Sequence, residues 1–344
     1  MAGILILRTK TVFVPKTILI ILFLWSGTVS AGGDHPVVTG LFELETAMAN
    51  KGSGSVTTPP GMSNNELEFN VPISGSFGAL ARFKHEDQVS GIDEAYLRYQ
   101  FGDSKQFRIV AGTAYLPFGQ FETSLISDPL TLTVGKTRSL ALALTSENGQ
   151  WLTSIFALPD SDAAGAGDTM AGGAGVRYQR GEDWHGYAFG FSAISNIIAA
   201  DGVASALGNP GANAKPVPAL AIDAEFGTGK YRVLLESVMT TDRFAVGDLG
   251  YVGVGAQPSA WRIELARRYQ AWRVPLIATA SWQQSREAVA LDLPETRLAA
   301  GFAAELSGSA ILAIEWARDA AYPTSVGGSG DIGDRLTLKL ALTF

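Results

Sequence analysis

Cysteine is absent from the 344-residue chain. Its absence excludes disulfide bridges, thiolate metal sites and a cysteine nucleophile. Histidine is scarce, and His35, His85 and His185 are far apart in the sequence. No Ser-His-Asp arrangement and no cluster with metal-ligand spacing can be recognised around them. We therefore expect no enzyme activity, with no catalytic residues, no metal site and no cofactor.

Long apolar runs are missing after residue 31, where no stretch approaches the ~20 residues that a transmembrane helix needs. The single long run, residues 17–25, follows three cations and precedes small residues. This order is typical of a secretory signal peptide, and the run is too short for a retained anchor. We expect a cleaved signal peptide at residues 1–31, export through the inner membrane, and a single domain at residues 32–344.

Positive charge is in short supply, because 26 Lys and Arg residues stand against 33 Asp and Glu residues and leave a net charge of −7. This balance argues against nucleic acid as a partner. Apolar residues are nevertheless abundant, at 47% of the chain. A membrane protein of this composition without apolar helices would have to be a β-barrel.

Strict alternation marks the segment 335–344, which has Leu or Phe at every even position and Arg, Thr, Lys or Ala at every odd one. A period of two is typical of a strand with an apolar environment on one face and a polar space on the other. Similar segments recur from residue 37, and the spacers between them are alternately long and short. The predicted strands are 37–49, 66–73, 77–85, 92–101, 107–114, 139–145, 151–158, 173–179, 184–194, 220–226, 231–239, 261–269, 276–284, 297–306, 311–318 and 335–344.

This pattern predicts an all-β fold, a transmembrane antiparallel β-barrel of about 16 strands of the bacterial outer-membrane porin type, with its tight turns at one rim. A soluble β-sandwich, the alternative, gives no reason for spacer lengths to alternate. A strand that ends in Phe344 resembles the closing strand of outer-membrane barrels, so we expect outer-membrane lipid and the barrel assembly machinery as partners. Aromatic residues near the tight turns are expected to form an interfacial girdle.

The polar face of the predicted strands carries many charged residues. Each unpaired charge would cost several kcal/mol in a dry core, so the pattern indicates a water-filled lumen. An ion-pair network that closes the lumen, as in a structural or adhesive barrel, is the alternative. The predicted inward residues are Glu43, Glu45, Glu66, Glu68, Arg82, Glu94, Arg98, Arg108, Asp223, Glu225, Arg232, Glu236, Arg262, Glu264, Arg268, Glu315 and Lys339.

The segment from Asp93 to Arg138 is the most distinctive part of the chain. It contains Glu-Ala-Tyr at 94–96, Pro-Phe-Gly at 117–119, Ile-Ser-Asp-Pro-Leu-Thr-Leu at 126–132 and Gly-Lys-Thr-Arg at 135–138. It resembles the LbtU-type siderophore porin family of outer-membrane β-barrels. The resemblance implies a channel for small solutes involved in ferric siderophore uptake, with an iron chelate in the lumen. A general or phosphate/anion-selective porin is the alternative, because phosphate-selective porins look similar at the first two motifs.

Residues 115–136 form a long predicted loop with unusual apolar content. A loop of this kind is expected to pack against other parts of the protein. We predict that it folds into the lumen and forms a constriction there. In the alternative, Asp128 and Pro129 form a simple turn and residues 130–134 extend the sixth strand. The predicted pore residues are Glu94, Arg98, Glu122, Asp128, Lys136 and Arg138.

Overall fold

The computed structural model describes residues 36–51, 54–86, 89–159, 170–182, 184–208, 215–271 and 273–344. The predicted signal peptide at residues 1–31 lies outside the described residues, as does His35. No helix in the described part of the chain is long and apolar enough to cross a membrane.

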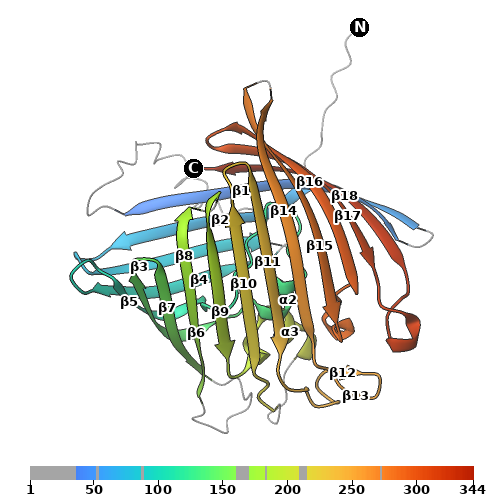
Figure 1. Ribbon diagram of the computed structural model, residues 1–344, viewed down its shortest axis with the longest axis horizontal. Coiled ribbons are helices and arrows are strands. Elements are labelled where there is room, and N and C mark those ends of the chain that lie inside the picture. The colour runs from blue at the N-terminus through green and yellow to red at the C-terminus, as the bar shows by residue number, and fades with distance from the viewer. Residues whose placement is uncertain are drawn as a thin grey trace.

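Sixteen strands form one closed antiparallel barrel in which each strand pairs with its neighbours in the chain, and this confirms the predicted fold class. The end of β14 and the start of β15 lie at the upper rim in Figure 1, and the small strands β12 and β13 lie at the lower rim. The barrel strands are β1 (Val37–Lys51), β2 (Gly54–Pro72), β3 (Phe77–Glu86), β4 (Val89–Phe101), β5 (Phe107–Tyr115), β6 (Arg138–Asn148), β7 (Trp151–Pro159), β8 (Met170–Glu182), β9 (His185–Ile194), β10 (Ala219–Gly227), β11 (Tyr231–Thr240), β14 (Ser259–Ala271), β15 (Val274–Arg286), β16 (Thr296–Ser307), β17 (Ala310–Ala320) and β18 (Ile332–Thr343).

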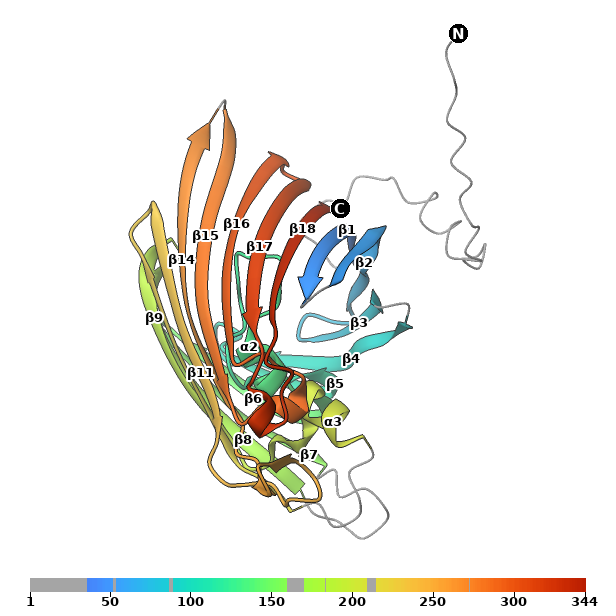
Figure 2. The same ribbon diagram turned by 90° about the vertical axis from the view of Figure 1, so that its right-hand side faces the viewer.

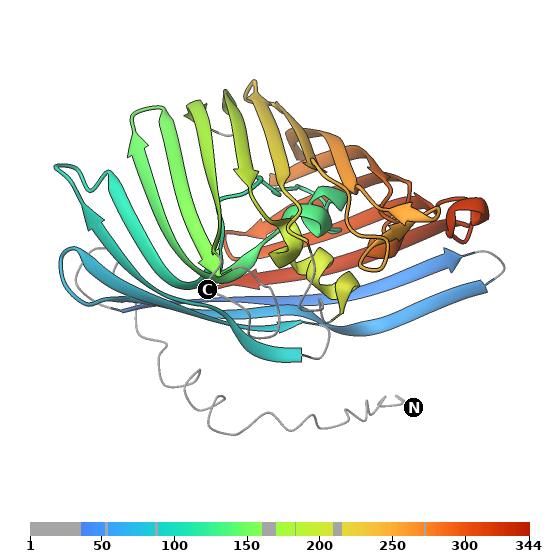
Figure 3. The same cartoon turned by 90° about the horizontal axis from the view of Figure 1, so that it is seen from below.

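The connections at the lower rim contain the remaining described elements. They are α2 (Leu130–Gly135), the 3-10 turn η1 (Ile197–Ala199), α3 (Asp201–Leu207), β12 (Gly250–Tyr251), β13 (Val254–Gly255), η2 (Val289–Leu291) and η3 (Thr324–Val326). Seen from below, α2 and α3 lie within the ring of strands (Figure 3). The connections that contain α2 and α3 therefore turn inward at this end of the barrel.

The barrel closes where β1 pairs with β18 (Figure 2). The amide of Gly40 donates to the carbonyl of Phe344 at 3.0 Å, and the amide of Phe344 donates back at 3.1 Å. The Phe344 ring stacks on Phe42, with 6.0 Å between ring centroids, and covers Gly40, where a Cβ would lie 2.2 Å from that ring. On the inner face, the Lys339 ammonium contacts the Glu43 carboxylate at 2.9 Å. Backbone, aromatic and ionic contacts therefore all cross this seam.

The two faces of β18 differ as the alternation predicts. Leu336, Leu338 and Leu342 are 43–45% exposed on the outer face, whereas Thr337 is 3% exposed on the inner face. The outer face is apolar, as contact with a bilayer requires. Aromatic rings on neighbouring strands also contact each other near the tight turns. Phe77 and Tyr99 are stacked at 4.4 Å between centroids, and Trp151 and Tyr178 meet edge to face at 4.9 Å.

Two predicted loops are wrong. Strand β2 begins at Gly54, so most of the predicted loop at 50–65 is strand, and β4 begins at Val89, before the predicted start at 92. The first half of β2 pairs with β1 alone, because β3 joins β2 only from Asn64 onward. A strand with one free edge tolerates proline and polar residues, which is why its composition is typical of a loop.

The alternative in which residues 130–134 extend the sixth strand is also wrong. Leu130 to Gly135 form α2, and β6 begins at Arg138. Leu130 and Val134, four residues apart, lie on the same face of this helix and are both buried. The helical spacing of these two residues was concealed by the alternating pattern around them.

Charge should be tolerated on the inner face of β18 and not on its outer face. We expect Leu338→Arg, at mid-strand on the outer face, to lower the yield of folded barrel, because Arg facing lipid at mid-depth costs roughly 2–4 kcal/mol. Ala341→Arg is the matched control, since Ala341 faces inward opposite Glu43. Heat-modified mobility in gels reports the folded fraction. Equal loss in both variants would contradict the assigned faces.

Candidate functional site

The connection between β5 and β6, residues 116–137, enters the barrel and crosses its lumen; we call it the crossing segment. It is held by side chains that point inward from the wall. On β9, the Ser192 hydroxyl accepts a hydrogen bond from the Gly119 amide at 3.0 Å. On β11, the Glu236 carboxylate accepts one from the Gln120 amide at 3.0 Å and another from the Thr131 hydroxyl.

Farther along the crossing segment, Glu264 on β14 accepts from the Ser124 amide at 2.8 Å and from the Thr123 hydroxyl at 2.6 Å. Glu315 on β17 accepts from the amides of Ile126 at 2.5 Å and Ser127 at 3.0 Å. Both carboxylates are at most 2% exposed. A buried carboxylate needs hydrogen-bond donors, and the amides of an irregular segment need acceptors, so these contacts serve both groups, although Glu315 Oε1 has no partner among the described residues.

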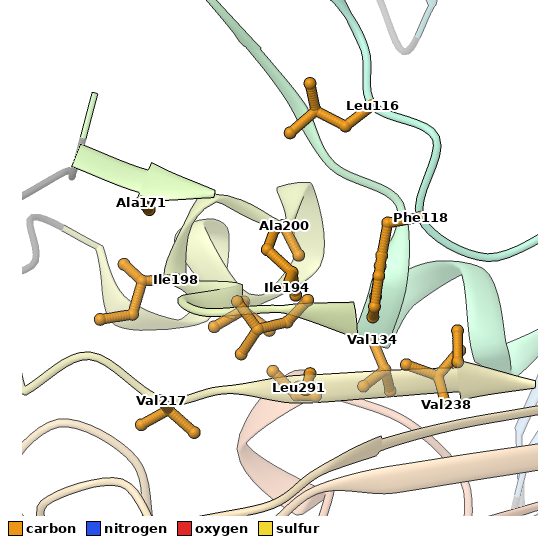
Figure 4. Packing of buried hydrophobic residues seen from close by; sticks show 14 of the residues in the cluster. Leu116, Phe118, Val134, Ala171, Ile194, Ile198, Ala200, Val217, Val238 and Leu291 are labelled. Carbon is orange, nitrogen blue, oxygen red and sulfur yellow. The ribbon is translucent and has the colours of Figure 1, made fainter. Parts of the chain in front are cut away.

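An apolar core lies on one side of the crossing segment, at the lower end of the barrel (Figure 4). Phe118, Leu130 and Val134 are buried there against Ile194 of β9 and Val238 of β11. The connections after β9, β11 and β15 complete the core with Ile197, Ile198, Val203, Val217, Phe244, Leu249 and Leu291. Apolar residues of the predicted loop at 115–136, which indicated packing against other parts of the protein, lie in this core.

Helix α3 closes the core from the β9–β10 connection. Its residue Gly202 packs directly on the crossing segment, because a Cβ there would lie 2.2 Å from the carbonyl oxygen of Thr133. The Asp201 amide donates to the carbonyl of Lys136 at 2.9 Å. Burial raises the pKa of the Asp201 carboxyl, although Arg138 and Lys136 lie near it and oppose the change.

Two of the predicted pore residues are exposed on the crossing segment inside the barrel. Glu122 forms an ion pair with Arg232 of β11 at 2.8 Å. Asp128 is exposed, and its carbonyl accepts a hydrogen bond from Arg297 of β16 at 3.2 Å. Their carboxylates therefore remain accessible to solvent.

The other four predicted pore residues, of which Lys136 lies at the end of the crossing segment and the rest on the barrel wall, make other contacts. Lys136 places its ammonium over the Tyr115 ring, 4.3 Å from the centroid, and Arg138 forms an ion pair with Asp93 at 3.0 Å. Glu94 accepts a hydrogen bond from the Tyr115 amide at 3.1 Å and forms an ion pair with Arg82 at 2.7 Å.

Arg98 donates to the Asn70 side chain at 2.7 Å. The structure therefore does not gather all six predicted pore residues around one opening.

Asp93 and Arg177 were missed as inward residues. The pairing of β3 with β4 shifts between Arg82 and Phe83, and this bulge turns both Asp93 and its neighbour Glu94 into buried positions. Two consecutive carboxylates in an otherwise alternating strand were the available signal. Arg177 of β8 forms ion pairs with Asp223 and Glu225. The alternation of side chains along β8 could have identified Arg177 as an inward residue.

Metal binding has no support in the described residues, where no group of three or more His, Asp or Glu side chains is placed to hold an ion. Many of the described lumen charges are instead paired with one another. On β3, for example, Arg82 contacts Glu68 at 2.6 Å and Glu66 at 3.8 Å.

Solved structures of similar shape are outer-membrane channels. The channel DcaP of Acinetobacter baumannii aligns with a TM-score of 0.61 at 12% identity, covering 90% of this chain and 97% of that one. OmpF of Salmonella typhi gives the same TM-score, identity and coverage, and OprB of Pseudomonas putida gives 0.59 at 8% identity, covering 90% and 94%. The chain has the fold of an outer-membrane porin.

Sequence relatives carry a family label without a stated activity. A UPF0422 protein of Legionella pneumophila (strain Lens) is 27% identical over 243 residues, which are 64% of this chain and 44% of that protein. A UPF0422 protein of Coxiella burnetii is 21% identical over 313 residues, 86% of this chain and 66% of that one. The chain thus spans less than half the length of the Legionella relative. No family model matches the chain.

Removing the Glu315 carboxylate should loosen the crossing segment. Glu315→Ala leaves the partly buried amides of Ile126 and Ser127 without an acceptor, at up to about 1–3 kcal/mol for each. We therefore expect a lower free energy of unfolding, measured in urea by tryptophan fluorescence. Glu315→Gln keeps one acceptor oxygen and should recover part of the loss. Glu305→Ala, which removes an exposed carboxylate, is the control. Wild-type stability of Glu315→Ala would show that this contact does not hold the segment.

Proposed function

We propose that the protein is a passive outer-membrane channel for small hydrophilic solutes. The observation that carries this proposal is the crossing segment, which wall carboxylates hold inside a closed barrel while Glu122 and Asp128 remain exposed. A segment that is fixed across the lumen narrows the lumen. Because its charged side chains remain in contact with water, the segment does not close the lumen. Field effects of a charge on a passing solute are strongest in such a narrow passage.

The alternative of a structural or adhesive barrel with a closed lumen is weaker. In a lumen closed by ion pairs, the paired side chains would be buried. The side chains of Glu66, Glu68 and Arg82 are paired but remain partly exposed. Their exposure favours a wet passage beside them.

For the solute, we propose an iron chelate of the siderophore type, on the resemblance of residues 93–138 to the LbtU-type siderophore porins. The names of the UPF0422 relatives do not indicate a solute. A general porin remains the alternative. An anion-selective porin is less well supported, because the exposed groups of the crossing segment at Glu122 and Asp128 are carboxylates.

The remaining parts of the proposal concern location. Residues 1–31 would be a cleaved signal peptide, and residues 32–344 would form one domain in the outer membrane. Lipid would contact the apolar outer face, and the barrel assembly machinery would insert the chain. The apolar outer face described for β18 supports the lipid contact.

Channel activity can be tested with purified protein in planar bilayers. We expect steady, ohmic conductance in potassium chloride, and liposomes containing the protein should take up a ferric hydroxamate chelate faster than a neutral oligosaccharide of similar mass. Equal rates would support a general porin. Absence of conductance from heat-modifiable, folded protein would support the structural barrel and refute the channel.

Selectivity should depend on Asp128. We expect Asp128→Asn to shift the reversal potential toward anions in a potassium chloride gradient, because the change removes an exposed negative charge from the passage. Asp103→Asn is the matched control, since Asp103 is exposed in the tight turn between β4 and β5. If both variants shift the potential equally, or neither does, Asp128 does not face the passage.

A further inference from the structure

The lumen has two unlike sides, and we infer that solutes pass along only one of them, the wall formed by β1, β2, β3 and β18. On this reading, Glu66, Glu68 and Arg82 set conductance, while the charged cluster Arg177, Asp223, Glu225 and Arg232 holds the barrel and the crossing segment in place. The inference rests on the proposed channel function and locates its path.

Exposure of the charged side chains separates the two sides. The side chains of Glu66, Glu68 and Arg82 are 23–27% exposed although all three are ion-paired. In the cluster on β8, β10 and β11, the exposure is 7–15%. Both groups pair carboxylates with arginine. The difference in exposed fraction therefore reflects what covers the side chains rather than their chemistry.

Cavity size shows the same contrast. A cavity of about 400 Å³ is lined by Thr39, Leu41, Glu66, Glu68, Arg82 and Thr343, among others. Beside Arg177, Asp223 and Glu225 the space is about 10 Å³, which is about the volume that one water needs. The first space has room for many waters, whereas the second has room for about one.

The crossing segment accounts for the covered side. Its hydrogen bonds from residues 119–131 run to β9, β11, β14, β15 and β17, and α2 contacts β11, β14 and β15. The inward side chains beneath it are buried in succession, as Arg232, Leu234, Glu236 and Val238 are on β11. The segment therefore rests on the far wall and leaves the wall of β1 to β3 facing the lumen.

This placement defines the borders of the path. Glu66 and Glu68 lie on the wall, and Asp128 lies on the crossing segment, whereas Glu122 pairs with Arg232 and lines the small space. Carboxylates thus border the path on both sides, and a charge added at the wall should act on the current as strongly as one added on the segment.

Single cysteines can test the path, because the chain contains no other thiol. Glu68→Cys and Asp223→Cys form a matched pair, since each replaces an inward carboxylate that contacts an arginine. A charged methanethiosulfonate reagent forms a disulfide with the thiolate and releases methanesulfinate. We expect the reagent to change the single-channel conductance of Glu68→Cys by about twofold and to leave that of Asp223→Cys unchanged.

Thr39→Cys and Thr279→Cys give a second pair that leaves the ion pairs intact. Thr39 lines the large cavity, and Thr279 faces inward on β15 but is buried. The reagent should alter the current through Thr39→Cys alone. Labelling after unfolding shows that every thiol is present and reactive.

Two results would overturn the inference. One is an equal current change at both members of either pair, and the other is no change at Glu68→Cys and Thr39→Cys despite complete labelling. Both require that the unlabelled variants conduct. Loss of all conductance in folded wild-type protein would instead refute the channel itself, so the two failures are distinguishable.

Discussion

Backbone amides that enter a closed barrel must find acceptors there, and the interior of this protein depends on that requirement. The crossing segment is too irregular to satisfy its own amides, so Glu236, Glu264 and Glu315 accept from it. These carboxylates are thereby used for structure and are buried away from solvent. The same placement brings Phe118 and Val134 onto the apolar core.

The sequence predicted the barrel well because a period of two is a local property of each strand. It separated the apolar outer face of β18 from its polar inner face, and it indicated that residues 115–136 pack against other parts of the protein. It failed at β2, where an unpaired edge permits loop-like composition, and at Asp93, where a bulge breaks the period.

The grouping of the pore residues was beyond the reach of that reasoning. Alternation shows which residues face inward and says nothing about depth or about which cation each acid meets. Arg138 meets Asp93, whereas Glu122 meets Arg232, more than a hundred positions away along the chain. Such pairings depend on strand register and on the route of the crossing segment. The porin-like structures share the fold at 8–12% identity, which agrees with a fold set by periodicity and interior contacts set by individual residues.

The distances along the chain between these partners also constrain the order of assembly. The amide of Ile126 meets Glu315, 189 positions later, and Leu130 meets Gln283, 153 positions later. Contacts of such high sequence separation form late, because the chain between them must already be arranged. The crossing segment can therefore settle only after β15 and β17 have joined the sheet. Until then the lumen lacks the narrowing that this segment provides, so the final width of the lumen depends on contacts that are made after those two strands have formed.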